Sequence, residues 1–234
     1  MIVNSQIIKD NIRRVKDEIA RTIVNSGRNP DDIRLMAVSK NHPYDVVKIA
    51  LDEGITLFGE NRVQEAMEKH PAKNERDYQL HMIGHLQTNK AKKTIPFFDM
   101  IQSVDSKHLA GEINKRAEQN NVTYEMLIEI NIGKENSKTG FSPDEIDVLP
   151  EIFDSLNNIC VKGVMSIPPF QYDLKKTRNF FIETRKIYEK LKNEYSFAKN
   201  FTTLSMGMSH DYTVAIEEGA NLLRIGTALF GARK

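Results

Sequence analysis

A lysine stands at the end of an apolar run, where parallel strands usually carry their functional side chains. The run Leu35-Met36-Ala37-Val38-Ser39 ends at Lys40, and Asn41-His42-Pro43 follow it. Burial at a strand end lowers the pKa of a lysine, and the neutral amine is a nucleophile for an aldehyde or a ketone. Lys40 is therefore a candidate Schiff-base lysine. The alternative is that its side chain points past the rim of the fold into water.

Two clusters of glycine and small hydroxyl residues lie near the C-terminus, each between a predicted strand and a helix. The first is Leu204-Ser205-Met206-Gly207-Met208-Ser209, and the second is Leu223-Arg224-Ile225-Gly226-Thr227. Such sequences expose backbone N–H groups at a helix start and suit an anion, above all a phosphate. The alternative for each cluster alone is ordinary turn and helix-cap chemistry.

A strand-end lysine and a phosphate-binding cup together are what a phosphorylated aldehyde requires. Pyridoxal 5'-phosphate (PLP) is such a molecule, because its aldehyde forms a Schiff base and its phosphate needs N–H donors. Two other interpretations stay open. A Schiff-base aldolase would use the cup for a phosphorylated sugar substrate, and an interaction module would use its surface helices rather than the pocket.

The elements that must position these residues follow an alternating pattern. Short apolar runs rich in β-branched residues alternate with stretches of helical period. The predicted strands are Ile33–Ser39, Ile55–Gly59, Gln79–Ile83, Met100–Val104, Tyr124–Ile130, Val161–Met165, Thr202–Ser205 and Leu222–Ile225. Eight such units predict an α/β fold, a (β/α)8 TIM barrel. An open doubly wound sheet would leave some of these strands unused.

Helical periodicity places the remaining elements between the strands and before the first one. The predicted helices include Tyr44–Glu53, Lys107–Gln119 and Leu174–Tyr195. An apolar stripe over Ile2–Asn25 predicts an extra helix, so that residues 1–26 pack on the barrel. No Gly/Ser linker interrupts the chain, which predicts one domain over residues 1–234.

Composition excludes several classes of protein. The 234 residues hold 33 Lys and Arg against 32 Asp and Glu, a net charge of +1 that argues against a nucleic-acid binder. One cysteine allows neither an internal disulfide nor a Cys-based zinc site. Since no signal peptide or membrane-length apolar run is apparent, we expect a soluble, cytoplasmic protein with no membrane partner.

Several motifs, in this order along the chain, resemble the pyridoxal phosphate homeostasis protein family. They run from about Ile33 to the C-terminus, and the N-terminal helix fits with weaker motifs. One departure is His85, where bacterial members often carry proline. The motifs are Ala37-Val38-Ser39-Lys40, Phe58–Glu65, His81–Lys90, Glu135–Gly140, Leu204–Ser209 with Asp211, and Arg224–Gly231.

The resemblance implies an alanine racemase-like barrel without the second domain, and it assigns roles to individual residues. Lys40 would carry the Schiff base, and Arg224 would face the pyridine nitrogen. Asn61 and the strand end Met165-Ser166 would lie near the ring, with Asn61 alternatively capping a helix over Arg62–Glu68. The phosphate would be lined by Ser205, Gly207, Met208, Ser209, Gly226 and Thr227.

The same resemblance implies a role in PLP (vitamin B6) homeostasis, in which the protein holds the cofactor as a Lys40 aldimine, buffers it or delivers it to PLP-dependent apoenzymes. An arginine beside the pyridine nitrogen only donates, so the ring stays neutral and is a weak electron sink. Racemases of this class take a second base from an extra domain, for which this chain has no room after Phe230. We therefore expect a non-catalytic and monomeric protein; the alternative is a PLP-dependent racemase-type enzyme.

The other reactive side chains form no convincing catalytic set. Cys160 is expected to pack before the sixth strand, at the end of the barrel remote from Lys40. His85 and His210 fall in loops, while His81 lies in the third strand on a face that the sequence leaves open. Asp211 is expected to cap the helix that follows it. No spacing typical of a metal site is present.

Overall fold

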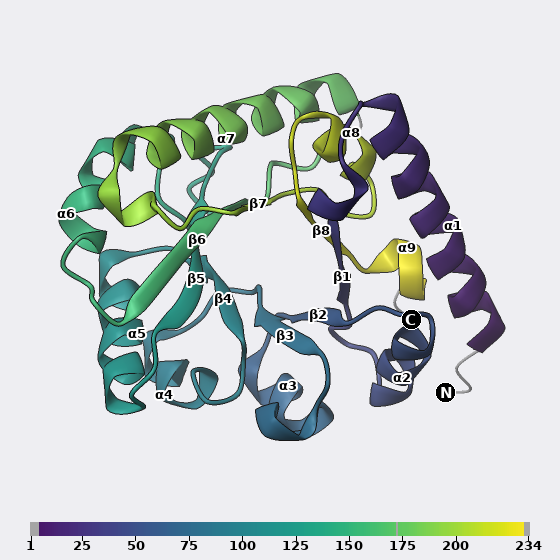
Figure 1. The fold of residues 1–234 in the computed structure, drawn as a ribbon, viewed down its shortest axis with the longest axis horizontal. Coiled ribbons are helices and arrows are strands. Elements are labelled where there is room, and N and C mark those ends of the chain that lie inside the picture. The colour runs from purple at the N-terminus through teal and green to yellow at the C-terminus, as the bar shows by residue number, and fades with distance from the viewer. Residues whose placement is uncertain (1–4, 172, 232–234) are drawn as a thin grey trace.

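The computed structural model describes residues 5–171 and 173–231, and its centre is a closed barrel of eight parallel strands in sequential order. Figure 1 looks into this ring, with the helices outside it. The predicted TIM barrel is confirmed, and the open sheet is excluded. The strands are β1 (Arg34–Val38), β2 (Leu57–Glu60), β3 (Gln79–Met82), β4 (Met100–Val104), β5 (Tyr124–Ile130), β6 (Ile159–Ser166), β7 (Thr203–Ser205) and β8 (Leu222–Ile225).

The strands form where the sequence is apolar on both faces, as strands in a parallel sheet covered by helices must be. Every residue of β2, β4 and β8 is buried. The bounds of Met100–Val104, Tyr124–Ile130 and Leu222–Ile225 are as predicted, and the others differ by one or two residues at an end. Strand β8 pairs with β1, with Ala37 opposite Ile225, which closes the ring.

The helices surround the barrel and bury one stripe each. In Figure 1, α7 crosses the top of the view and α1 lies along the right-hand side. The helices are α1 (Ser5–Asn25), α2 (Tyr44–Asp52), α3 (Val63–Lys69), α4 (Ala91–Thr94), α5 (Lys107–Gln119), α6 (Leu149–Phe153), α7 (Leu174–Glu194), α8 (Tyr212–Glu217) and α9 (Thr227–Phe230).

Helix α1 packs against α2, α8 and α9, so it joins the first and last βα units. Its apolar residues Ile8, Ile12, Val15, Ile19 and Ile23 recur every three or four positions and are buried. The predicted start of this helix at Ile2 lies outside the described residues. No helix in the described chain is both long and apolar enough to cross a membrane.

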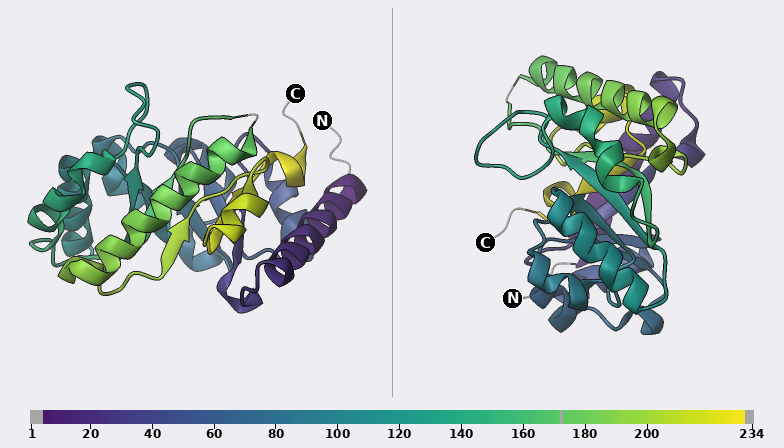
Figure 2. Two further views of the ribbon diagram at one scale, coloured as in Figure 1. Left: turned by 90° about the horizontal axis from the view of Figure 1, so that it is seen from above. Right: turned by 90° about the vertical axis from the view of Figure 1, so that its left-hand side faces the viewer.

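The loop after β5 is the most prominent of the loops at the carboxyl ends of the strands. Ser142 and Glu145 form a capping box at the 3-10 helix Pro143–Val148. The segment between β5 and this turn projects from the barrel in both views of Figure 2. In a TIM barrel the loops that follow the strands form the functional face, and the predicted site residues lie in these loops or at the strand ends that lead into them.

Candidate cofactor site

The residues singled out in the sequence lie at the carboxyl ends of neighbouring strands. Lys40 follows β1 by two residues and is half-buried, and Asn61 directly follows β2. Met165 and Ser166 end β6, and Ser205 ends β7; all three are fully buried. Because all strands are parallel, these positions share one end of the barrel.

Arg224 is buried inside that end and joins three strands. Its Nη1 donates to Ser205 Oγ at 2.6 Å, and its Nη2 donates to the carbonyl oxygen of Ser166 at 2.8 Å. Burial lowers the pKa of Arg224 to about 10, while the charges of Asp211 and Glu129 act to raise it. The guanidinium therefore stays protonated at neutral pH and remains a donor.

The side chains that support Arg224 from within the barrel were not predicted from the sequence. Ser205 Oγ donates to Gln102 Oε1 at 2.8 Å, and Gln102 Nε2 pairs with Nδ1 of His81 at 2.9 Å. Burial lowers the pKa of His81 to about 3, so this ring is neutral. The hydroxyl of Ser205 is thus turned toward Arg224 and Gln102. The feature of the sequence that could have indicated this is the polar Gln102 inside the otherwise mostly apolar run Met100–Val104.

The loop after β7 is held in a shape that requires glycine. Gly207 has a φ of +92°, and a Cβ there would come within 2.6 Å of the Ala215 Cβ. The N–H of Met208 donates to Asp211 Oδ1 at 2.6 Å. Asp211 stands at the N-cap position of α8, but its side chain makes no cap hydrogen bond. The predicted capping role is therefore wrong, because this carboxylate binds the preceding loop instead.

The loop after β8 meets both the β7 loop and β1. Ser209 Oγ accepts a hydrogen bond from the N–H of Ala228 at 3.0 Å, within α9. A Cβ on Gly226 would lie 3.2 Å from the carbonyl oxygen of Val38, which is tighter than ordinary packing. Thr227 begins α9 and is exposed. The two glycine clusters and the strand that leads to Lys40 are therefore neighbours.

Asn61 does not cap a helix, which corrects the alternative considered for it. Helix α3 begins at Val63 with Arg62 at its N-cap position. The Oδ1 of Asn61 is buried without a hydrogen-bond partner. A Cβ on Gly84 would lie 2.4 Å from the carbonyl oxygen of Asn61, so the backbones touch here. A buried acceptor with no partner at the strand ends is free to receive a ligand donor.

A buried polar cluster around Glu60, which was not predicted from the sequence, holds the end of β1 next to Lys40. Glu60 Oε1 accepts from Ser39 Oγ at 2.6 Å and lies 2.8 Å from Lys69 Nζ and 3.2 Å from His70 Nε2. Lys69 Nζ also donates to the carbonyl oxygens of Ser39 at 2.8 Å and His42 at 3.1 Å. Lys69 therefore ties both sides of Lys40 to the end of β2.

Glu129 adds a titratable group to the same end of the barrel. Burial raises the pKa of Glu129 to about 7, helped by the charge of Asp105 and opposed by Arg224, Thr139 and His85. In the unfolded chain this carboxyl has an ordinary pKa, so unfolding releases a proton between about pH 4.5 and pH 7. The contribution of Glu129 to the free energy of unfolding is therefore fully present at low pH and is lost as the pH rises from about 4.5 to about 7.

We expect Glu129→Gln to stabilise the protein at pH 8 by about 2 kcal/mol and to change nothing at pH 4. At pH 8 the native protein carries a half-buried carboxylate that the amide replaces, and at pH 4 both side chains are neutral. Urea unfolding at the two pH values measures the difference. The exposed Glu118→Gln is the control, and an equal gain at both pH values would contradict the assignment.

The remaining candidates are not part of this constellation. Cys160 lies within β6, not before it, at the strand end remote from Lys40, and it is half-buried. The side chain of His85 is exposed and pairs with Asp105 at 2.8 Å. His210 is exposed and its ring lies against Phe170. In the part of the chain that the structure describes, no three His, Cys, Asp or Glu side chains form a metal-binding group.

The site fits PLP in its donors and acceptors. It offers an amine at Lys40, a buried cationic donor at Arg224, and an acceptor without a partner at Asn61 Oδ1. A Cβ at Gly207 would clash with Ala215 and one at Gly226 would be tight against Val38, so both loops pack closely on their neighbours.

Comparison with known proteins connects this geometry to a family. The family model described as "Alanine racemase, N-terminal domain" matches residues 3–234. The pyridoxal phosphate homeostasis protein of Aquifex aeolicus is 41% identical over 225 residues, which cover 96% of this chain and 98% of that protein.

Solved structures show the same fold. PipY of Synechococcus elongatus PCC7942, solved with PLP bound, is 33% identical with a TM-score of 0.81 and covers 96% of this chain and 100% of its own. The alanine racemase of Clostridium difficile is 18% identical with a TM-score of 0.75 over 96% of this chain and 60% of its own, a likeness of fold. The predicted resemblance is confirmed: the chain belongs to the pyridoxal phosphate homeostasis protein family, which shares the fold of the alanine racemase N-terminal domain.

Proposed function

We propose that this protein binds PLP covalently at Lys40 and serves PLP homeostasis by holding and releasing the cofactor. The observation that carries the proposal is the buried Arg224, which bridges the ends of β6 and β7 on the face where β1 leads to Lys40. The relative solved with PLP bound, and the names of the curated relatives, support the same conclusion.

Each residue of the site has a proposed part. When bound, PLP would supply an electrophilic aldehyde carbon, and Lys40 would hold the cofactor through its amine, with the aldehyde oxygen leaving as water. Arg224 donates toward the pyridine nitrogen, and Asn61, Met165 and Ser166 border the ring. The phosphate is received by the two glycine-containing loops, with Ser205, Gly207, Met208, Ser209, Gly226 and Thr227.

A cofactor carrier explains the site better than an amino-acid racemase does. Arg224 stays protonated and is too weak an acid to protonate the pyridine nitrogen, so the ring is a weak electron sink, which racemases of this class tolerate with the help of a second base. The homeostasis relative matches over 98% of its own length, whereas the racemase matches over 60%. We therefore propose that the protein does not turn over amino acids. Exchange of the α-proton of alanine with solvent D2O, at a rate above that of free PLP, would contradict this.

The cellular setting is also a proposal. We propose that residues 1–234 act as one domain, as a monomer in the cytoplasm, with PLP-dependent apoenzymes as recipients and with no nucleic-acid or membrane partner. The near-neutral net charge of +1 supports the absence of a nucleic-acid partner.

Borohydride trapping tests the covalent attachment. After incubation with PLP, we expect the purified protein to show an absorbance band in the near-ultraviolet or visible range. Reduction with borohydride should remove this band and leave the reduced cofactor on the peptide that contains Lys40. Lys40→Ala should lose the absorbance and the label, while Lys115→Ala, an exposed lysine on α5, should keep both. A colourless wild-type protein after incubation would instead favour the aldolase interpretation.

A further inference from the structure

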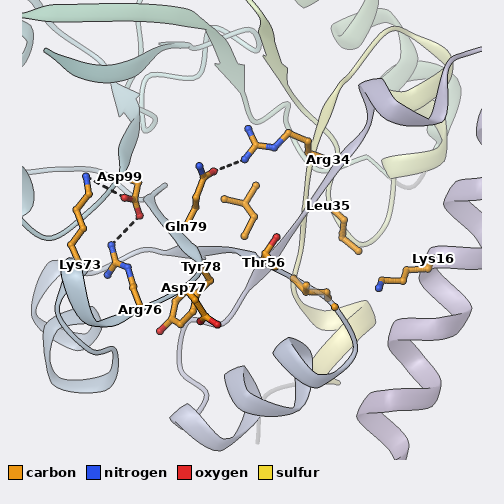
Figure 3. A pocket seen from close by; sticks show the side chains of 13 residues that line it. Lys16, Arg34, Leu35, Thr56, Lys73, Arg76, Asp77, Tyr78, Gln79 and Asp99 are labelled. Carbon is orange, nitrogen blue, oxygen red and sulfur yellow. Dashed lines mark hydrogen bonds and ion pairs between the residues drawn. The ribbon is translucent and has the colours of Figure 1, made fainter.

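The end of the barrel opposite the cofactor site contains a cavity of about 720 Å³. It lies among the starts of β1, β2 and β3, and α1 borders it in Figure 3. Arg34 begins β1, and Lys40 comes six residues later, which separates the cavity from the cofactor site by about 20 Å along the strand. The cavity is thus independent of the proposed function.

Cationic side chains outnumber acidic ones in the lining. Four cations face two carboxylates, and Lys73 and Arg76 share one of these, Asp99, at 3.1 and 3.0 Å. Asp99 also accepts from the N–H of Leu80 at 2.8 Å, which fixes its position. The charged side chains of the lining are Lys16, Arg34, Lys73, Arg76, Asp77 and Asp99.

Among the described residues, two of the cations have hydrogen-bond partners that are neutral. Arg34 Nη2 donates to Gln79 Oε1 at 2.5 Å, and Lys16 Nζ donates to the carbonyl oxygen of Glu53 at 2.5 Å. Figure 3 shows Arg34 reaching Gln79 and Lys16 extending from α1. Arg34 is exposed at the start of β1, and among the described residues its guanidinium forms no ion pair. Its charge is therefore accessible to an anion in the cavity.

Arg76 contributes a buried donor to the same lining. Its side chain is 1% exposed and its Nη2 is bound to Asp99, but its Nε has no hydrogen-bond partner. The other end of the guanidinium is held by the carbonyl oxygens of Pro71 and Phe97 as well as by Asp99, so Arg76 contributes a fixed positive charge to the lining.

We propose that this cavity binds a small molecule that carries a phosphate group. Guanidinium groups match phosphate oxygens in geometry as well as in charge, and Arg34 keeps N–H donors beyond the one used by Gln79. The volume is that of a small-molecule pocket. Leu35, Ile55 and Leu57 line it as well and offer apolar contact to an organic part.

Pyrophosphate binding to the PLP-loaded protein tests the proposal, because loading fills the other phosphate site. We expect calorimetry to show binding that Arg34→Gln weakens about tenfold, as the loss of one charge-assisted contact does. Lys73→Gln should weaken it about threefold, since Asp99 already holds part of that charge. Lys115→Gln on α5 makes the same change in net charge and should leave the affinity unchanged.

Three outcomes would overturn the proposal. They are no binding at millimolar pyrophosphate, equal weakening by all three variants, and binding that appears only as PLP leaves the protein. Cofactor absorbance, recorded in the same titration, detects the last outcome. Failure of covalent attachment at Lys40 would appear in the borohydride experiment instead, so the two proposals fail separately.

Discussion

Lys69→Met is expected to lower the free energy of unfolding by about 3 kcal/mol, because it leaves a buried carboxylate without its cation. The side chain of Glu60 is 0% exposed and that of Lys69 is 7% exposed. Burial acts to raise the pKa of Glu60, but hydrogen bonds from His70, Lys69 and Ser39 and the charge of Lys69 outweigh it and hold the pKa below its ordinary value. Without Lys69 the remaining partners are neutral.

The same substitution should weaken PLP binding, since Lys69 Nζ holds the carbonyl oxygens of Ser39 and His42 on either side of Lys40. Urea unfolding measures the stability, and an absorbance titration with PLP measures the affinity. The double variant Glu60→Gln/Lys69→Met is the matched control, because it removes the unpaired charge and should recover part of the stability but not the affinity. If the double variant recovered both the stability and the affinity for PLP, Lys69 would not position the segment around Lys40.

The cluster around Glu60 is an example of a feature that could not be predicted from the sequence. The strand that leads to Lys40 and the glycine loops after β7 and β8 were predictable, because apolar periodicity and turn chemistry are local properties. The partners of Glu60 were not, since Lys69 and His70 reach it only once α3 has folded back over β2. Gln102 was missed for the same reason, because its role depends on Ser205, 103 residues away.

The two helix-cap interpretations that the structure excludes, for Asn61 and for Asp211, have one physical cause. Asn61 and Asp211 each precede a helix and are residue types that favour the N-cap. In the fold, Arg62 takes the cap position of α3, and the Asp211 carboxylate is drawn to the N–H of Met208. At the functional end of the barrel, tertiary contacts compete with helix capping for polar side chains, and propensity alone does not decide which prevails.

Arg224→Gln is expected to destabilise the protein by about 3 kcal/mol at pH 8 and by less at pH 5. It removes two donors, which leaves Ser166 O and Ser205 Oγ short of a partner, and it removes the cation near Asp211 and Glu129. Arg224 acts to lower the pKa of Glu129, so its loss should raise that pKa further above 7. At pH 5 this carboxyl is protonated in either protein, so the missing cation matters less.

Unfolding curves at the two pH values measure this dependence, and the absorbance band of bound PLP is read in the same samples. Arg224→Lys keeps the charge but not the planar guanidinium that reaches β6 and β7 together, so it should keep the pH dependence of the wild type while losing part of the stability. Because Arg224 is proposed to donate to the pyridine nitrogen, Arg224→Gln should also shift the PLP band and weaken binding. An unchanged band with reduced stability would mean that Arg224 supports the barrel without touching the cofactor.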